Sequence, residues 1–208
     1  MTNHRHATLQ DQRGFSLIEI MVTLGVLALV AALATPAIMS MAPNMRLRTA
    51  TNDLHANLMR AKSRAVKDNR NVGFSVTTVN CVPAVFAPGG NGGAYRIFID
   101  DGGGDLTKAR NNTWDAAHVT GGTNYPAEEI LVDVNDTSGD GIDDLPESVA
   151  ICAQGFNATA PPTTATTGFT STGLLQNAAS GNVTLTNSQG DQYRVSLSPA
   201  GGVATEKL

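Results

Sequence analysis

Residues 15–34 read FSLIEIMVTLGVLALVAALA, an apolar run that decides the architecture of the chain. At about 1.5 Å per helical residue, a run of this length would span a hydrocarbon core of about 30 Å. Residues 1–14 are polar and contain Arg5 and Arg13. The positive-inside rule therefore places the N-terminus in the cytoplasm. We expect a single membrane-spanning helix over residues 15–38, with the rest of the chain on the far side of the membrane.

A carboxylate, that of Glu19, lies near the start of this apolar run. An ionisable residue inside a membrane helix is unfavourable by about 3 kcal/mol and usually has a function. A cleaved secretory signal peptide is the alternative interpretation. Its apolar region, however, is typically about 7–15 residues long and ends at a small-x-small cleavage site. The longer run with an internal Glu favours a functional membrane anchor.

The hexapeptide Gly14-Phe15-Ser16-Leu17-Ile18-Glu19 resembles the prepilin peptidase motif of type IV pilins and type II secretion pseudopilins. The resemblance implies cleavage between Gly14 and Phe15, N-methylation of Phe15 and an assembly role for Glu19. Residues 1–14 would then be a prepilin leader. A buried carboxylate is best tolerated beside a cation, and the free amine of a neighbouring subunit's Phe15 is the natural candidate.

The same resemblance implies partners and a location. The partners would be the prepilin peptidase, other pilins or pseudopilins, and the inner-membrane assembly platform. The chain would sit in the inner membrane with a cytoplasmic N-terminus and a periplasmic C-terminal domain.

A second helical pattern begins at Asn44 and predicts an amphipathic continuation over residues 39–70. Its apolar stripe has spacings typical of one helix face and consists of Leu47, Leu54, Leu58, Ala61 and Ala65. We expect one long helix from about Phe15 to Asn69, although Pro36 and Pro43 can kink or interrupt a helix. A basic stripe consists of Arg46, Arg60, Arg64 and Lys67. A solvated face or a subunit contact is favoured for it over a surface for DNA or anionic lipid.

Residues 71–208 alternate short β-runs with Gly-rich breaks and predict a β-rich globular domain. The fold class is α+β, a long N-terminal helix packed on an antiparallel β domain. The expected strands are Val72–Val79, Tyr95–Asp100, Ile130–Val134, Val149–Cys152, Val183–Thr186 and Tyr193–Leu197. The Thr/Ala/Pro-rich stretch Asn157–Thr172 is expected to be an exposed loop.

Within the pilin group, this layout is similar to the GspH/FimT-like branch. The likeness is carried by MRLRTATNDLHANLMRAKSRAVKDNRNV (residues 45–72), YRIFIDDGGGD (residues 95–105) and GNVTLTNSQGDQYRVSLSPAGGV (residues 181–203). It implies a GspH-like minor pseudopilin, a structural subunit of the type II secretion pseudopilus that supports protein export. The alternative is a FimT-like minor pilin of a type IV pilus, acting in assembly priming or DNA uptake.

Nucleic acid is a disfavoured partner. DNA-binding members of this branch end in a Gly-Arg-x-Arg-type turn, whereas this chain has Gly201-Gly202-Val203-Ala204. Arginine grips phosphates bidentately, so its absence weakens a DNA-binding interpretation. Removal of residues 1–14 changes the formal net charge from −4 to −5, because this segment holds two arginines and one aspartate.

Catalytic signatures are missing from the sequence. After cleavage, only His55 and His118 remain, and they lie far apart. There is no Gly-x-Ser-x-Gly motif, phosphate-binding loop or His-rich metal spacing. We expect a structural subunit that is not an enzyme and that requires no cofactor.

One acidic loop resembles the first part of a calcium-binding loop. Its oxygen donors lie at calcium-loop positions and are Asp136, Ser138, Asp140, Asp144 and Glu147. The alternative is a solvated acidic β-turn. Asp100, Asp101 and Asp105 form a weaker candidate set.

The chain has two cysteines, Cys81 and Cys152. Both follow the predicted span and therefore lie on the side of the membrane where thiols oxidise. Each is in or next to a predicted strand. We expect a disulfide between them that ties two segments of the sheet together.

Overall fold

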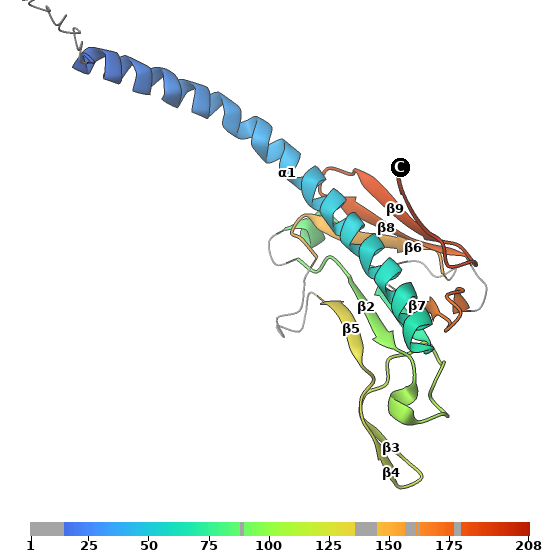
Figure 1. Cartoon of the computed structure of the whole chain (residues 1–208). Helices are drawn as coiled ribbons and strands as arrows, with labels where there is room; N and C mark the ends of the chain where they lie inside the picture. Colours follow the sequence, from blue (N-terminus) through green and yellow to red (C-terminus); the bar gives the residue numbers. More distant parts are fainter. Residues whose placement is uncertain (1–14, 88–89, 136–144, 157–160, 162, 177–179) are drawn as a thin grey trace, which may run out of the picture. The chain divides into compact units, whose positions relative to one another are not determined.

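The structure is a computed structural model that describes residues 15–87, 90–135, 145–156, 161, 163–176 and 180–208 (Figure 1). The side chains of residues 34–39 and 135 lie outside this description. Two compact units divide the chain, Met1–Ser40 and Met41–Leu208. The helix α1, Leu17–Asp68, contributes residues to both units.

Helix α1 runs without interruption through Pro36 and Pro43. It ends in a Schellman motif: Asn69 adopts a left-handed conformation with φ 52°, and the Arg70 amide donates to the Ala65 carbonyl at 3.1 Å. Asn tolerates this conformation better than most residues, because its short polar side chain can hydrogen-bond locally. The single helix expected from about Phe15 to Asn69 is confirmed.

The Met41–Asp68 part of α1 buries one face. The buried side chains of this face are Leu47, Ala50, Thr51, Leu54, Leu58, Ala61 and Ala65. Each fully buried Leu contributes about 1.5–3 kcal/mol to folding. The apolar stripe predicted from the sequence is confirmed at all of its positions.

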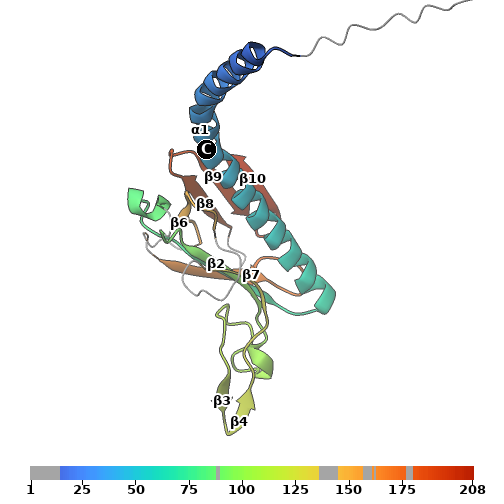
Figure 2. The ribbon, with the colours of Figure 1, turned by 90° about the vertical axis from the view of Figure 1, so that its left-hand side faces the viewer.

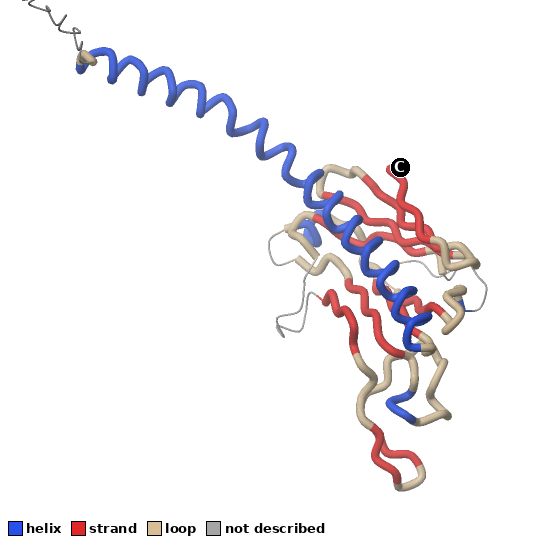
Figure 3. The backbone as a smooth tube through the Cα atoms, in the orientation of Figure 1, coloured by secondary structure: helices blue, strands red, loops and turns tan. Residues whose placement is uncertain are grey.

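Two four-stranded antiparallel sheets make up most of the second unit (Figures 1 and 3). The first sheet has the order β5–β2–β1–β7, with bounds Ile130–Asn135, Ala94–Ile99, Val72–Thr77 and Thr164–Phe169. The second has the order β10–β9–β8–β6, with bounds Val203–Lys207, Gln192–Leu197, Gly181–Asn187 and Val149–Gln154. Two short 3₁₀ helices, Pro83–Phe86 and Gly102–Gly104, lie in the connections.

The hydrophobic core lies between the buried face of α1 and both sheets. The first sheet contributes the large buried side chains Phe74, Ile97 and Phe169, and the second contributes Ile151, Leu185 and Leu197. The predicted α+β class, a helix packed on antiparallel sheets, is confirmed.

The loop prediction for Asn157–Thr172 was wrong at Thr164–Phe169, which forms β7 and pairs with β1. Ala165, Thr167 and Phe169 are buried at alternate positions. This alternation of buried residues indicates a strand. The composition of the stretch, rich in Thr, Ala and Pro, favoured a loop instead.

A small hairpin, β3 (His118–Thr120) and β4 (Thr123–Tyr125), was also absent from the predicted strands. Gly121 and Gly122 connect its strands with φ values of 57° and 83°. Two consecutive positive φ angles are the geometry of a type I′ turn, which Gly-Gly permits. Figures 1 and 2 show that this hairpin projects from the end of the second unit.

Candidate functional site

The residues with a predicted assembly role lie at the start of α1. The Ser16 carbonyl accepts hydrogen bonds from the backbone amides of Glu19 at 3.0 Å and Ile20 at 3.2 Å, and these bonds close the first turn of the helix. Glu19 lies in this turn, where the helix dipole favours a carboxylate by about 0.3–1 kcal/mol. Gly14 and the predicted leader lie outside the described residues.

From Phe15 to Leu33, every side chain is exposed. The large apolar side chains on this surface are Phe15, Leu17, Ile18, Ile20, Met21, Val22, Leu24, Val26, Leu27, Leu29, Val30 and Leu33. A helix that is apolar on all sides is normally buried in protein or lipid, so the apolar side chains of this segment need to be covered.

In the part of the chain that the structure describes, no helix combines the length and the apolar character needed to cross a membrane. The membrane span expected at residues 15–38 stays a prediction.

The basic stripe of α1 is partly neutralised within the second unit. Arg46 lies 3.7 Å from the Glu147 carboxylate, and Arg64 lies 2.6 Å from that of Asp68. Partly exposed pairs of this kind contribute about 0–1 kcal/mol. The other two basic residues of the stripe are exposed and form no ion pair with any described residue. The stripe therefore presents less free positive charge than its sequence suggests.

The turn that replaces a DNA-binding Gly-Arg-x-Arg sequence joins β9 to β10. Gly201 adopts a φ of 69°, and its amide donates to the Ser198 carbonyl at 2.8 Å. The Lys62 ammonium donates to the Gly201 carbonyl at 2.8 Å. The turn is thus attached to α1 by the nearby Lys62 side chain.

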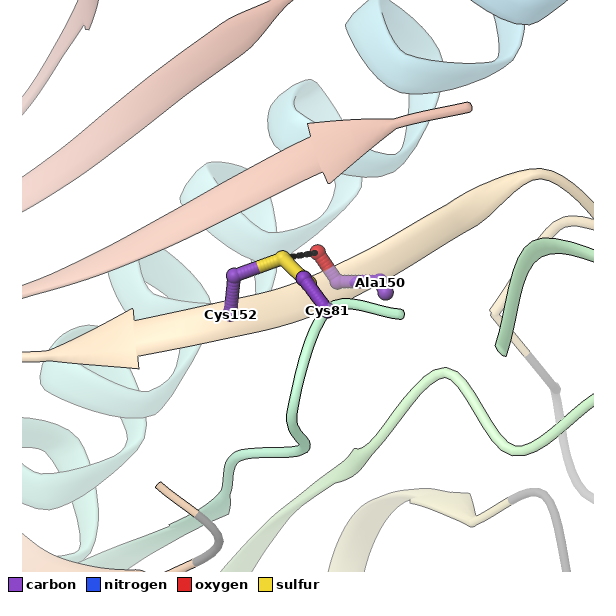
Figure 4. The surroundings of a disulfide bond; sticks show 3 residues. All are labelled: Cys81, Ala150 and Cys152. Carbon is purple, nitrogen blue, oxygen red and sulfur yellow. Dashed lines mark hydrogen bonds between the residues drawn. A yellow bond between two sulfur atoms is a disulfide. The ribbon is translucent and has the colours of Figure 1, made fainter. Parts of the chain in front are cut away.

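Cys81 and Cys152 are joined by a disulfide with a Cα–Cα distance of 5.5 Å. Figure 4 shows the bond between the segment that follows β1 and strand β6, with the Cys152 sulfur 3.7 Å from the Ala150 carbonyl oxygen. The two cysteines are 71 residues apart in the sequence. A disulfide that closes a loop of this length lowers the entropy of the unfolded chain, and this effect stabilises the fold by up to about 4 kcal/mol.

Most of the predicted calcium loop, namely Asp136, Ser138, Asp140 and Asp144, lies outside the described residues. Its last member, Glu147, is described and faces Arg46. Calcium binding at this loop stays a prediction.

The weaker acidic set does not converge on one point. Asp100 accepts backbone amides of the following loop, Asp101 pairs with Arg70 at 3.0 Å, and Asp105 contacts His118 at 3.2 Å. Among the described residues, no three His, Cys, Asp or Glu side chains gather closely enough to hold a metal ion. The weaker candidate set of Asp100, Asp101 and Asp105 therefore does not come together as a metal site.

Buried carboxylates instead organise the segment 101–128, a role that sequence reasoning missed. Glu128 accepts the amide of Gly102 at 2.6 Å and that of Asp115 at 2.9 Å. Burial raises the pKa of both Asp100 and Glu128, while the hydrogen bonds that they accept partly offset this effect. These acids act as backbone caps.

Asp105 fixes the base of the β3–β4 hairpin. Thr107 donates to it through its hydroxyl at 2.7 Å and its amide at 2.9 Å, and these bonds lower the pKa of Asp105. Nε2 of His118 lies 3.2 Å from the other Asp105 oxygen, and the His118 ring stacks on Tyr125. The run DDGGGD was the available sequence signal, because Asp beside Gly is typical of capped turns.

A second feature absent from the sequence predictions lies on the first sheet. Arg96 of β2 donates to Asp133 of β5 through Nε at 2.9 Å and Nη2 at 2.5 Å. The guanidinium carbon of Arg96 lies 4.8 Å from the ring centroid of Trp114, which is cation–π geometry. The register of β2 and β5 brings Arg96 and Asp133 together, and the path of the segment 101–128 adds Trp114.

Two family models match the chain. The model described as "Type II transport protein GspH" matches residues 50–201. The model described as "Prokaryotic N-terminal methylation motif" matches residues 9–35, which contain the start of α1. No curated protein matches the chain significantly.

Solved structures also resemble the chain. The type IV minor pilin FimU of Pseudomonas aeruginosa is 16% identical over 80% of this chain and 91% of its own, with a TM-score of 0.42. The minor pseudopilin EpsH of the Vibrio cholerae type 2 secretion system is 10% identical over 78% of this chain and 97% of its own, with a TM-score of 0.41.

Proposed function

This chain belongs to the GspH family of type II transport proteins, and from that membership we propose that it is a minor pseudopilin of a type II secretion system. At the coarser level, it is a pilin-like subunit of either a type II secretion pseudopilus or a type IV pilus. The family match supports the finer assignment, because the description of the matching model names type II transport.

The start of α1 supports a role in filament assembly. The methylation-motif match covers the residues around Phe15, and the side chains that follow are apolar and exposed. We propose that prepilin peptidase cleaves after Gly14 and that the new Phe15 amine is methylated. The amine of one subunit would then approach the Glu19 carboxylate of its neighbour, where the two opposite charges offset the desolvation of each.

The anchor also sets the proposed location. Residues 15–38 would hold the chain in the inner membrane until assembly, with the second unit in the periplasm. A disulfide between Cys81 and Cys152 is compatible with such an oxidising compartment. The partners would be other pseudopilins, the prepilin peptidase and the inner-membrane assembly platform.

Leader processing tests the anchor chemistry. A Gly14→Val variant is expected to keep its leader, because a β-branched side chain at the cleavage position would block the peptidase. Mass spectrometry of the membrane fraction should find a chain that retains residues 1–14 and carries no methylated Phe15. A Val22→Ala variant, altered in the apolar run, should be processed normally. A Gly14→Val chain that still begins at Phe15 would contradict the processing proposal.

Deletion of the gene in its own host separates the two systems. The type II proposal expects loss of secreted proteins from the medium with surface pili intact. Loss of pili with normal secretion would assign the chain to a type IV pilus instead. Complementation with the intact gene should restore whichever phenotype is lost.

A further inference from the structure

The outer face of the first sheet carries an ordered array of polar side chains. Strand register aligns Asp133, Arg96, Ser75 and Thr166 in one row across β5, β2, β1 and β7. The next row contains Ala94, Thr77 and Thr164. These side chains point away from the core, because their neighbours along each strand are the buried residues Phe74, Val76, Tyr95, Ile97, Val134 and Ala165.

A third row on the same face is covered. Phe98 is fully buried although it lies outside the main core cluster. It pairs with Gly73, where a Cβ atom would lie 2.3 Å from the Phe98 ring, so only glycine fits beneath that ring. A Cβ atom at Gly168 would lie 3.1 Å from the Asn112 side chain. The segment 101–128 thus folds over one end of this face and brings Trp114 against Arg96 of the first row. Apart from the buried Asp133, the rest of the first two rows stays at least partly exposed.

The first two rows form a groove of about 410 Å³. This volume falls within the range of about 300–1,000 Å³ that is typical of small-ligand sites. Thr113 and Trp114 of the covering segment line it together with the two rows. Its floor is rigid, because strands hold it, and sites on strands are positioned more accurately than sites on loops.

Four side chains of the floor carry hydroxyl groups: Ser75, Thr77, Thr164 and Thr166. Thr77 and Thr164 hydrogen-bond to each other across the strands at 2.9 Å. The hydroxyls of Ser75 and Thr166 have no hydrogen-bond partner among the described residues. Each hydroxyl can both donate and accept, so the floor matches a ligand that carries many hydroxyls of its own.

The charges in the groove cancel. The Asp133 side chain is only 4% exposed and is neutralised by Arg96. The Arg96 guanidinium also makes a cation–π contact with the Trp114 ring. Its positive charge therefore interacts with Asp133 and Trp114 and is not free to bind a ligand. A groove without free charge offers little to an anionic ligand, since phosphate binding needs unpaired Arg or Lys groups.

We propose that this groove binds a neutral oligosaccharide. The floor hydroxyls would bind the sugar hydroxyls, and the partly exposed Trp114 would contact the apolar face of a ring. An extended peptide fits less well, because peptides usually add to a sheet edge through main-chain groups. Here the groove lies on the face of the sheet, across all four strands, and the main-chain groups of its central strands β1 and β2 already pair on both sides. This inference does not depend on the filament role proposed above.

The single tryptophan of the chain makes the test direct. Trp114 lines the groove, so its fluorescence reports on the site without interference from another indole. The full chain would be held in a detergent whose head group is not a sugar. It would be titrated with tri-N-acetylchitotriose and with maltotriose, each to about 20 mM, beyond the millimolar Kd of a shallow site. At least one of these neutral sugars should give a saturable change in Trp114 emission.

Two variants locate the binding. The double change Ser75→Ala and Thr166→Val removes the free hydroxyls and should weaken binding at least ten-fold. Ala94→Gln should weaken binding by filling the floor. Thr205→Val, at an exposed position on β10, is the matched control and should bind like the wild type. Thermal melting of each variant establishes that it is folded before binding is compared.

Three outcomes would overturn the proposal. The first is that neither sugar gives a saturable change in Trp114 emission. The second is binding that the double variant, folded as the wild type is, leaves unchanged. The third is saturation by an anionic heparin oligosaccharide or by a Ser/Thr-rich peptide in place of the neutral sugars.

Discussion

Helix α1 has two parts whose surroundings differ. Between residues 17 and 33 every side chain is exposed, and most are large and apolar. Between Met41 and Asp68 one apolar stripe, from Leu47 to Ala65, is buried against the two sheets, and a few apolar side chains such as Met45 lie exposed. The second part draws its stability from its own domain, whereas the first needs a lipid or protein environment from outside the domain. One helix is therefore packed on its own domain at one end and leaves apolar side chains exposed at the other.

The largest expected effect comes from Glu19. Glu19→Ala should reduce incorporation into filaments more than ten-fold, because no carboxylate remains to meet the Phe15 amine of an incoming subunit. Leader processing and the unfolding free energy of the domain should stay at wild-type values. The measurement is the fraction of chain recovered in sheared filaments, with Thr23→Ala as the control. Normal recovery of Glu19→Ala would show that the first part of α1 associates through apolar contact alone.

A matched pair of leucines measures the contrast in stability. Leu58→Ala should lower the free energy of unfolding by about 2–5 kcal/mol, because it leaves a cavity beneath the sheets. Leu27→Ala removes the same atoms from a side chain that is 63% exposed. This variant should change the free energy of unfolding by less than about 0.5 kcal/mol. Urea denaturation in detergent, followed by Trp114 fluorescence, gives both values. Equal losses would mean that the two parts of α1 unfold as one body.

The disulfide is expected to have a somewhat smaller effect, confined to the second unit. Replacing both Cys81 and Cys152 by Ser should lower the unfolding free energy by about 2–4 kcal/mol. Reducing agent should bring the wild type to the value of the variant and leave the variant unchanged. Two free thiols in oxidised protein, detected by alkylation without reduction, would contradict the bond.

The helix and most strands could be predicted because their signals are local. The stripe from Leu47 to Ala65 has helical spacing, and six of the expected strands lie where β1, β2, β5, β6, β8 and β9 form. The β3–β4 hairpin was also within reach, since Gly121-Gly122 between short polar β-runs is a known turn signal. It was overlooked because its strands are short and weakly apolar.

The groove on the first sheet could not have been predicted in the same way. Arg96 and Asp133 are far apart in the sequence, and Trp114 belongs to neither strand. Their contact depends on the pairing of β2 with β5 and on the path of segment 101–128, both of which are set by tertiary packing. A one-residue shift in register would turn Asp133 toward the core.

The bond between Cys81 and Cys152 also bears on how this protein can change over evolution. The covalent ring that it closes contains β2, β3, β4 and β5, together with the whole segment that covers the first sheet. The entropy of a closed loop changes slowly with length, by about 0.6 kcal/mol for each doubling. Residues can therefore be inserted at the projecting hairpin, or lost from it, while α1 and the second sheet keep their packing.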